Sequence, residues 1–270
     1  CSYRGSLHLR NVRRSETMKK LKTMRAGRLV RSVVYTAPSR QPEPRSRGPR
    51  RQISTEAQAR FNLSKSTDKL EMLIALNFPG GFWWVTLTYD DAHLPEDRKA
   101  AGQIMRKYIR KLRAAWKLKG KDLLYIYCTQ QVQDDGSLRL HHHMVLSAAD
   151  GGKDDFDTIR ALWTYGSNIY IEWQNDDQAV TDKATYMTHE PRDHGKPRPG
   201  ERTWTPCRGL KRPEVETIDV PDEVTLEAPA GAVTIERDGT RNEWGEFAFI
   251  KYWLPKPGQL YGPHFNSGGR

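Results

Sequence analysis

Two strand-like segments joined by a short turn constrain the fold more than any other feature of this 270-residue sequence. Residues 123–132 (LLYIYCTQQV) and 138–146 (LRLHHHMVL) are dominated by apolar and aromatic residues, and the turn-forming sequence DDGS lies between them. This arrangement predicts an antiparallel hairpin. Side chains alternate between the two faces of a strand, so His141 and His143 share one face, about 6.6 to 6.8 Å apart at their backbones.

The segments around this hairpin predict an α+β fold. Helical patterns span 54–78, 98–119, 154–163 and 177–189, and further strands are expected at 28–37, 82–89 and 168–173. Residues 98–119 carry an apolar stripe on a basic helix. Beyond residue 200, strand-like pieces occur at 223–227, 232–236 and 247–253. We therefore expect an antiparallel sheet with helices packed on a face, followed by a C-terminal β-rich extension.

The positive charge of the chain is concentrated near its N-terminus. Residues 1–50 hold 14 Lys and Arg against Glu16 and Glu43, whereas the other 220 residues have a net charge of -1. Such an arm attracts polyanions, nucleic acid above all, although a solvated tail is the alternative. The candidate DNA-binding residues are Arg13, Arg14, Lys19, Lys20, Lys22, Arg25 and Arg28.

Composition shifts predict three parts. Residues 1–55 form a basic arm with one strand and a Pro/Arg linker, residues 56–200 the main domain, and residues 201–270 the β-rich extension. The apolar runs are too short for a transmembrane helix, and the three cysteines contain no CxxC pair. We therefore expect a cytoplasmic protein with no membrane role.

His141 and His143 are candidate metal ligands because two imidazoles on one strand face can converge on one cation. Borderline ions such as Mn²⁺ accept imidazole, and a third, oxygen ligand is expected for harder ions. Gln130 or Gln131 on the partner strand could supply it, and alternation allows only one of them to do so. The alternative is a histidine run that is hydrogen-bonded or solvated and holds no metal.

Three motifs, in order, resemble the replication-initiator branch of the HUH (His-hydrophobe-His) endonucleases, in particular rolling-circle replication proteins of plasmids and of filamentous-phage gene II type. Residues 85–89 (VTLTY) resemble the first strand motif. Residues 140–146 resemble the HUH strand, with His142 in the hydrophobe's place, and residues 184–192 (ATYMTHEPR) resemble the tyrosine helix. The stretch 202–206 (RTWTP) also resembles this family.

The resemblance implies an antiparallel sheet with the HUH strand at its centre, and a nicking reaction. Tyr186 would attack origin DNA that is single-stranded or extruded as a hairpin, leaving a 5′-phosphotyrosine and a free 3′-hydroxyl, and could rejoin strands. His141, His143 and Gln130 would hold Mn²⁺ or Mg²⁺. The partners would be the origin strand and the helicase and polymerase of a bacterial host. Without the HUH strand, a packing aromatic would be the simpler interpretation of Tyr186.

The sequence departs from the family at one position, because His189 stands where the motif has lysine three residues after the tyrosine. Lys183 lies three residues before Tyr186 on the same helical face and is a candidate replacement, with a solvent-exposed lysine as the alternative. The rival interpretations are a single-tyrosine transposase or a relaxase with the same chemistry, and a DNA-binding protein with impaired catalysis.

Overall fold

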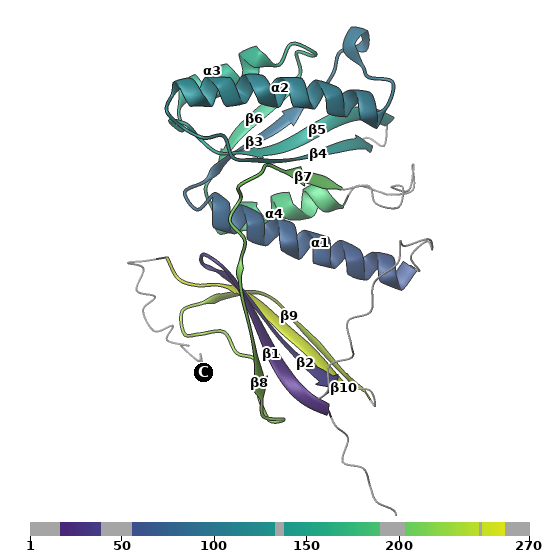
Figure 1. Ribbon diagram of the computed structural model, residues 1–270, viewed down its shortest axis with the longest axis vertical. Helices are drawn as coiled ribbons and strands as arrows, with labels where there is room; N and C mark the ends of the chain where they lie inside the picture. The colour runs from purple at the N-terminus through teal and green to yellow at the C-terminus, as the bar shows by residue number, and fades with distance from the viewer. Residues whose placement is uncertain (1–16, 39–55, 133–137, 190–202, 243–244, 257–270) are drawn as a thin grey trace, which may run out of the picture. The chain divides into compact units, whose positions relative to one another are not determined.

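The computed structural model describes residues 17–38, 56–132, 138–189, 203–242 and 245–256. They form two compact units, each built on a five-stranded antiparallel sheet (Figure 1). One sheet has the strand order β6-β3-β5-β4-β7, and the other has the order β8-β1-β2-β10-β9. The α+β fold with an antiparallel sheet predicted from the sequence is confirmed.

One unit, here called the helical unit, contains the described helices and the hairpin predicted at residues 123–146. Its hairpin strands are β4 (Tyr125–Val132) and β5 (Leu138–Leu146), and β5 is the central strand of its sheet. The remaining elements are α1 (Glu56–Asn77), β3 (Phe82–Leu87), a 3-10 turn (Asp91–His93), α2 (Arg98–Leu118), α3 (Lys153–Leu162), β6 (Ile169–Gln174), α4 (Asp177–Thr188) and β7 (Trp204–Pro206).

Period-two alternation in β3 and β5 divides the side chains of this sheet between a face covered by α2 and a face that carries His141 and His143. Trp83, Val85 and Leu87 of β3 join Met144 and Leu146 of β5 in the main core. The apolar stripe of α2 covers this face with Ala101, Met105, Tyr108, Ile109, Leu112 and Trp116. Figure 1 places α2 and α3 on this side and α4, with α1 beside it, on the other, so the helices cover both faces of the sheet.

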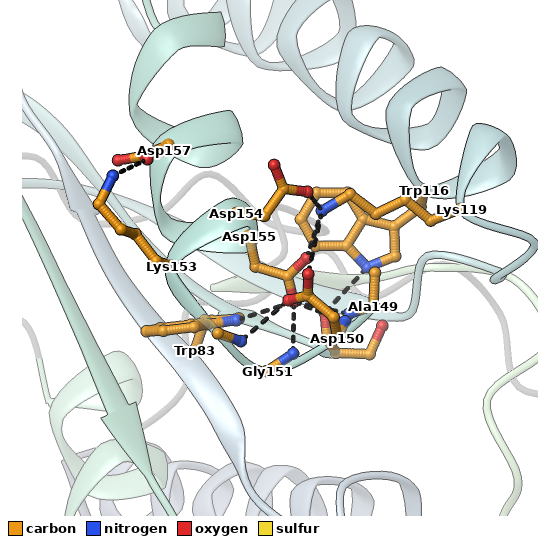
Figure 2. A network of polar contacts seen from close by, with 12 residues as sticks. Trp83, Trp116, Lys119, Ala149, Asp150, Gly151, Lys153, Asp154, Asp155 and Asp157 are labelled. Atoms are coloured by element: carbon orange, nitrogen blue, oxygen red, sulfur yellow. Dashed lines mark hydrogen bonds and ion pairs between the residues drawn. The ribbon is translucent and has the colours of Figure 1, made fainter.

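A buried carboxylate joins α3 to the loop before it. Asp155 has no exposed surface, and its Oδ2 accepts hydrogen bonds from the backbone amides of Ala149, Asp150 and Gly151 at 2.8, 3.1 and 3.0 Å (Figure 2). Its Oδ1 lies 2.8 Å from the Lys119 ammonium. A buried charge is tolerated only when it is paired and hydrogen-bonded in this way. Asp155 therefore fixes the 149–152 loop between β5 and α3.

The second unit combines strands from both ends of the described chain. It contains β1 (Thr17–Ala26), β2 (Leu29–Pro38), β8 (Glu214–Val220), β9 (Val233–Asn242) and β10 (Gly245–Trp253). The sequence pattern predicted a single strand in residues 1–55, and this strand corresponds to β2. The lysine-rich β1 was missed because its charges are compensated by distant residues, such as Glu246, which lies 2.7 Å from Lys19.

The strand expected at 223–227 is absent from the structure. These residues form a loop whose Val224 and Leu226 pack on the core of the second sheet with Val30, Val34 and Ile250. Their apolar character reflects this packing and not strand pairing. Among the described helices, none is both long and apolar enough to cross a bilayer.

Candidate active site

His141 and His143 lie together on the face of the central strand β5 that α2 does not cover. Their side chains are 5% and 3% exposed, and their ring centroids are 4.9 Å apart with the planes at 85°. His142, between them, points to the opposite face, where its Nε2 lies 2.7 Å from the Tyr89 hydroxyl and its Nδ1 2.9 Å from the Thr129 hydroxyl. The alternation expected from the sequence thus gives two histidines on one face.

Hydrogen bonds at Nδ1 orient both of these imidazoles. The Nδ1 of His141 donates to the Arg139 carbonyl at 2.9 Å, which leaves the lone pair on Nε2. The Nδ1 of His143 lies 3.0 Å from the Thr86 hydroxyl. The Nε2 of His143 is buried and has no hydrogen-bond partner among the described residues. Buried polar atoms normally have partners, so this nitrogen is a candidate to bind a ligand atom or a metal ion.

The electrostatic environment keeps His143 neutral. Burial lowers the pKa of His143 to about 3, and the neighbouring His141, His142 and Lys183 contribute to the same shift. A metal-binding imidazole must be in its neutral form. His143 is therefore in the protonation state of a ligand throughout the physiological pH range.

Gln130 lies directly across the hairpin from His141 and is 5% exposed. Its Nε2 donates a hydrogen bond to the backbone carbonyl of Tyr186 at 3.0 Å. Gln131, the alternative that the sequence left open, belongs to the other face by strand alternation. The structure thus places Gln130 directly beside His141.

Tyr186 projects from α4 toward the histidines and remains accessible. Its ring centroid is 4.8 Å from that of His143, at an interplanar angle of 87°, and the residue is 42% exposed. Asp176 caps the helix by accepting a hydrogen bond from the Ala179 amide at 2.7 Å. The Gln130 hydrogen bond anchors the backbone of Tyr186 to β4, while the Tyr186 side chain stays partly exposed.

Trp84 belongs to the candidate site, although its position in an apolar strand segment is typical of a core residue. It is 4% exposed, yet its indole stacks on His143 with a centroid distance of 5.2 Å and an angle of 6°. The same indole meets the Tyr186 ring edge-on at 5.9 Å. The alternation of β3 could have revealed it, because Trp84 shares its face with Thr86, the direct cross-strand partner of His143.

The two candidates for the missing lysine occupy different surroundings. The ammonium of Lys183 lies 5.0 Å from the centroid of the Trp84 ring. The same ring also contacts the rings of His143 and Tyr186. His189 follows α4 as its C-terminal cap, where its Nδ1 donates to the Thr185 carbonyl at 2.9 Å. Lys183 is thus close to the aromatic and imidazole cluster, whereas His189 is engaged in ending the helix.

Residues 82–191 match the family of replication-associated proteins that is named for ORF2 and for the gene II protein. The match is consistent with a rolling-circle replication protein, and it spans β3, β5 and α4, the elements that carry His141, His143, Trp84 and Tyr186. No curated protein and no solved structure matches the chain.

A second group of possible metal ligands lies on the α2 and α3 side of the sheet. Ligand atoms of Asp150, Asp154 and Asp155 lie within 4.8 Å of one another. The Lys119 ammonium contacts all three carboxylates (Figure 2). This cation already compensates the negative charge, so the group is a structural ion-pair network and does not identify a metal.

The basic residues proposed to contact DNA have varied surroundings. Arg13 and Arg14 lie outside the described residues. Lys19 is 8% exposed and pairs with Glu246, and Lys20 lies 2.8 Å from Asp219. Arg28 makes two hydrogen bonds of 2.8 Å to Asp177. Lys22 is half-buried and Arg25 is exposed, so Arg25 is the most accessible of the described candidates.

Proposed function

We propose that this chain is a metal-dependent replication initiator that nicks and rejoins single-stranded origin DNA through Tyr186. The observation that carries the proposal is the contact of the Tyr186 ring with His143, whose buried Nε2 has no hydrogen-bond partner among the described residues. Gln130 holds the backbone of the same tyrosine. The match to replication-associated proteins over the same elements supports it independently.

The donor set fits a divalent cation. The Nε2 atoms of His141 and His143 and the side-chain oxygen of Gln130 would hold Mn²⁺ or Mg²⁺, because the amide nitrogen of Gln130 is engaged with Tyr186. A bound cation would stabilise negative charge on the non-bridging oxygens of the scissile phosphate. The hydrogen bonds of both Nδ1 atoms would fix the rings in the orientation that ligation requires.

The reaction assigned to Tyr186 is a transesterification. Its phenolic oxygen forms a bond to phosphorus as the bond between phosphorus and the 3′-oxygen breaks, and the proton lost by the phenol is balanced by protonation of the leaving 3′-oxygen. The products are a 5′-phosphotyrosine and a 3′-hydroxyl that a polymerase can extend. Attack by the 3′-hydroxyl on the phosphotyrosine reverses the step and rejoins the strand.

Lys183 is the residue we infer to replace the family lysine. A phenol is mostly protonated near neutral pH, so a nearby cation that favours the phenolate promotes attack. The position of the Lys183 ammonium over the indole that touches Tyr186 supports this assignment. His189 is the less suitable candidate because its Nδ1 is bound to a backbone carbonyl.

The test is to incubate the full chain with Mn²⁺ and labelled single-stranded oligonucleotides that carry the cognate origin, followed by denaturing gel electrophoresis. We expect an SDS-stable protein–DNA adduct that is lost in Tyr186→Phe and after chelation. Tyr170→Phe is the matched control, because Tyr170 is also an exposed tyrosine of the same unit. Persistence of the adduct in Tyr186→Phe would overturn the proposal. Absence of an adduct from the wild type would favour a DNA-binding protein with impaired catalysis.

A further inference from the structure

Helix α2 carries a concentration of positive charge that the proposed nicking reaction does not use. The helix contains eight Lys and Arg residues and no acidic residue. Its apolar stripe is buried in the core, so the charges lie on the outward side. We define the basic face of α2 as six of its exposed residues, Lys99, Arg106, Lys107, Arg110, Lys111 and Lys117. Arg113 is also exposed but is not included, because it hydrogen-bonds Tyr125.

The basic face is not neutralised by the surrounding protein. None of its six residues makes an ion pair with an acidic side chain in the part of the chain that the structure describes, and the nearby Asp150 and Asp154 contact Lys119 instead. Arg106 and Arg110, and likewise Lys107 and Lys111, are four residues apart, a spacing at which like charges repel and destabilise a helix. These four charges therefore do not serve the stability of α2.

From these observations we propose that the basic face of α2 binds the phosphate backbone of double-stranded DNA. Lys99 and Lys117 are 18 residues apart, which corresponds to a stripe of about 27 Å along a helix. A duplex of that length presents roughly 16 phosphate charges. The partner is thus identified by charge complementarity, and contacts of this kind recognise no base sequence.

Other anionic partners fit this face less well. Proteins that bind unpaired strands usually offer exposed aromatic rings for base stacking, but the aromatic residues of α2, Tyr108 and Trp116, are fully buried. Basic helices that bind membranes insert their apolar side, and in α2 that side is packed against the sheet. A duplex backbone requires only an array of cations.

This surface is separate from the candidate active site. Figure 1 places α2 on one face of the β6-β3-β5-β4-β7 sheet and α4, which carries Tyr186, on the other. A duplex on α2 therefore leaves the tyrosine side free for a single strand. The inference does not depend on the nicking chemistry, because it concerns a different face and a sequence-independent contact.

The test is the salt dependence of binding to a labelled DNA duplex of unrelated sequence, measured by fluorescence anisotropy with the full chain. We expect the triple variant Arg106→Gln, Arg110→Gln, Lys117→Gln to bind about tenfold or more weakly at roughly 0.1 M salt. The slope of log affinity against log salt should fall by about 2 to 3, since each lost phosphate contact accounts for about 0.9. Glutamine is a good helix former, so the fold should persist.

The matched control removes three exposed basic residues elsewhere in the same unit, through Arg208→Gln, Lys211→Gln and Arg212→Gln. The control should retain most of the affinity and slope for the duplex. Equal losses in the two triple variants, an unchanged slope in the α2 variant, or no duplex binding by the wild type would each overturn the inference. Adduct formation on single-stranded origin DNA should survive in the α2 variant, so failure of the nicking proposal is seen separately.

Discussion

The indole of Trp84 and the imidazole of His143 lie nearly parallel, with 6° between their planes and 5.2 Å between their centroids. The indole thus fixes one face of a candidate metal ligand whose Nδ1 is held by Thr86. Its ring also contacts Tyr186 edge-on and lies under the Lys183 ammonium. One buried side chain therefore positions three residues of the candidate site.

We predict that Trp84→Phe lowers Mn²⁺ affinity by about tenfold, because residues that orient metal ligands typically contribute a factor of 10 to 100. Trp84→Ala should lower it further and also destabilise the unit by about 3–5 kcal/mol. Titration calorimetry with Mn²⁺ measures this without any nicking assay. The neighbouring Trp83→Phe, which acts on the opposite face of β3, should leave Mn²⁺ affinity near the wild-type value. An unchanged affinity in Trp84→Phe would contradict the positioning role.

Gln130→Glu should bind Mn²⁺ more tightly than the wild type, because a carboxylate adds negative charge to a ligand set that is otherwise neutral. The same change removes the amide that donates to the Tyr186 carbonyl, so adduct formation should not rise in proportion to metal affinity. Gln131→Glu is the control, since it adds the same charge at the next residue along the strand. Tighter Mn²⁺ binding by the wild type than by Gln130→Glu would count against this ligand.

His142→Leu should destabilise the helical unit by about 2–3 kcal/mol, although leucine fits the family pattern better. The reason is that the buried Tyr89 hydroxyl and the half-buried Thr129 hydroxyl both lose their imidazole partner. Adding Tyr89→Phe to His142→Leu should recover part of this loss, which urea denaturation of the single and double variants can measure. Strictly additive effects of the two substitutions would show that the hydrogen bond is unimportant.

Asp155→Asn should destabilise the helical unit at neutral pH by about 2–4 kcal/mol. Burial alone would raise the pKa of Asp155, but hydrogen bonds from Lys119 and from the Gly151, Ala149 and Asp150 amides hold it below the usual 3.8. Because the folded pKa is depressed, the carboxylate's contribution is fully present above about pH 4 to 5 and is lost as the pH falls through the folded pKa.

The difference in unfolding free energy between wild type and Asp155→Asn should therefore shrink below about pH 4, as measured by urea denaturation at a series of pH values. Asp157→Asn is the control from the same helix. Asp157 is exposed, and its ion pair within the described part of the chain is with Lys153 at 2.5 Å, so its replacement should change stability by less than about 0.5 kcal/mol. A difference for Asp155→Asn that stays constant from about pH 7 to pH 3 would contradict the role given to its charge.

The central elements of the helical unit were predictable because their residue patterns are local. The β4–β5 hairpin, the α2 stripe and the alternation that puts His141 and His143 on one face follow from side-chain periodicity. Alternation also left only one glutamine able to join them, and the structure places Gln130 there. The roles of these residues remain predictions, to be tested as described above.

Other features depend on contacts that no local pattern encodes. Strand β1 pairs its lysines with acidic residues about 200 positions away, so its charged sequence resembles a flexible arm when considered alone. Trp84 lies in an apolar strand segment that is typical of the core. Its contact with a candidate metal ligand is visible only in the structure, where its indole stacks on His143. The short strand β7 has a partner only because Ile126, Tyr127 and Cys128 of β4 lie along it.

The sharing of one sheet by strands β1, β2, β8, β9 and β10 has a consequence for synthesis of the protein on the ribosome. Strands β1 and β2 emerge first, but the strands that flank them, β8 and β10, are made only after every element of the helical unit has been translated. A hairpin of β1 and β2 therefore has both edges unpaired until those strands are made. Unpaired edges can pair with strands of other chains. Lysines along β1 oppose that association until the acidic residues that neutralise them arrive.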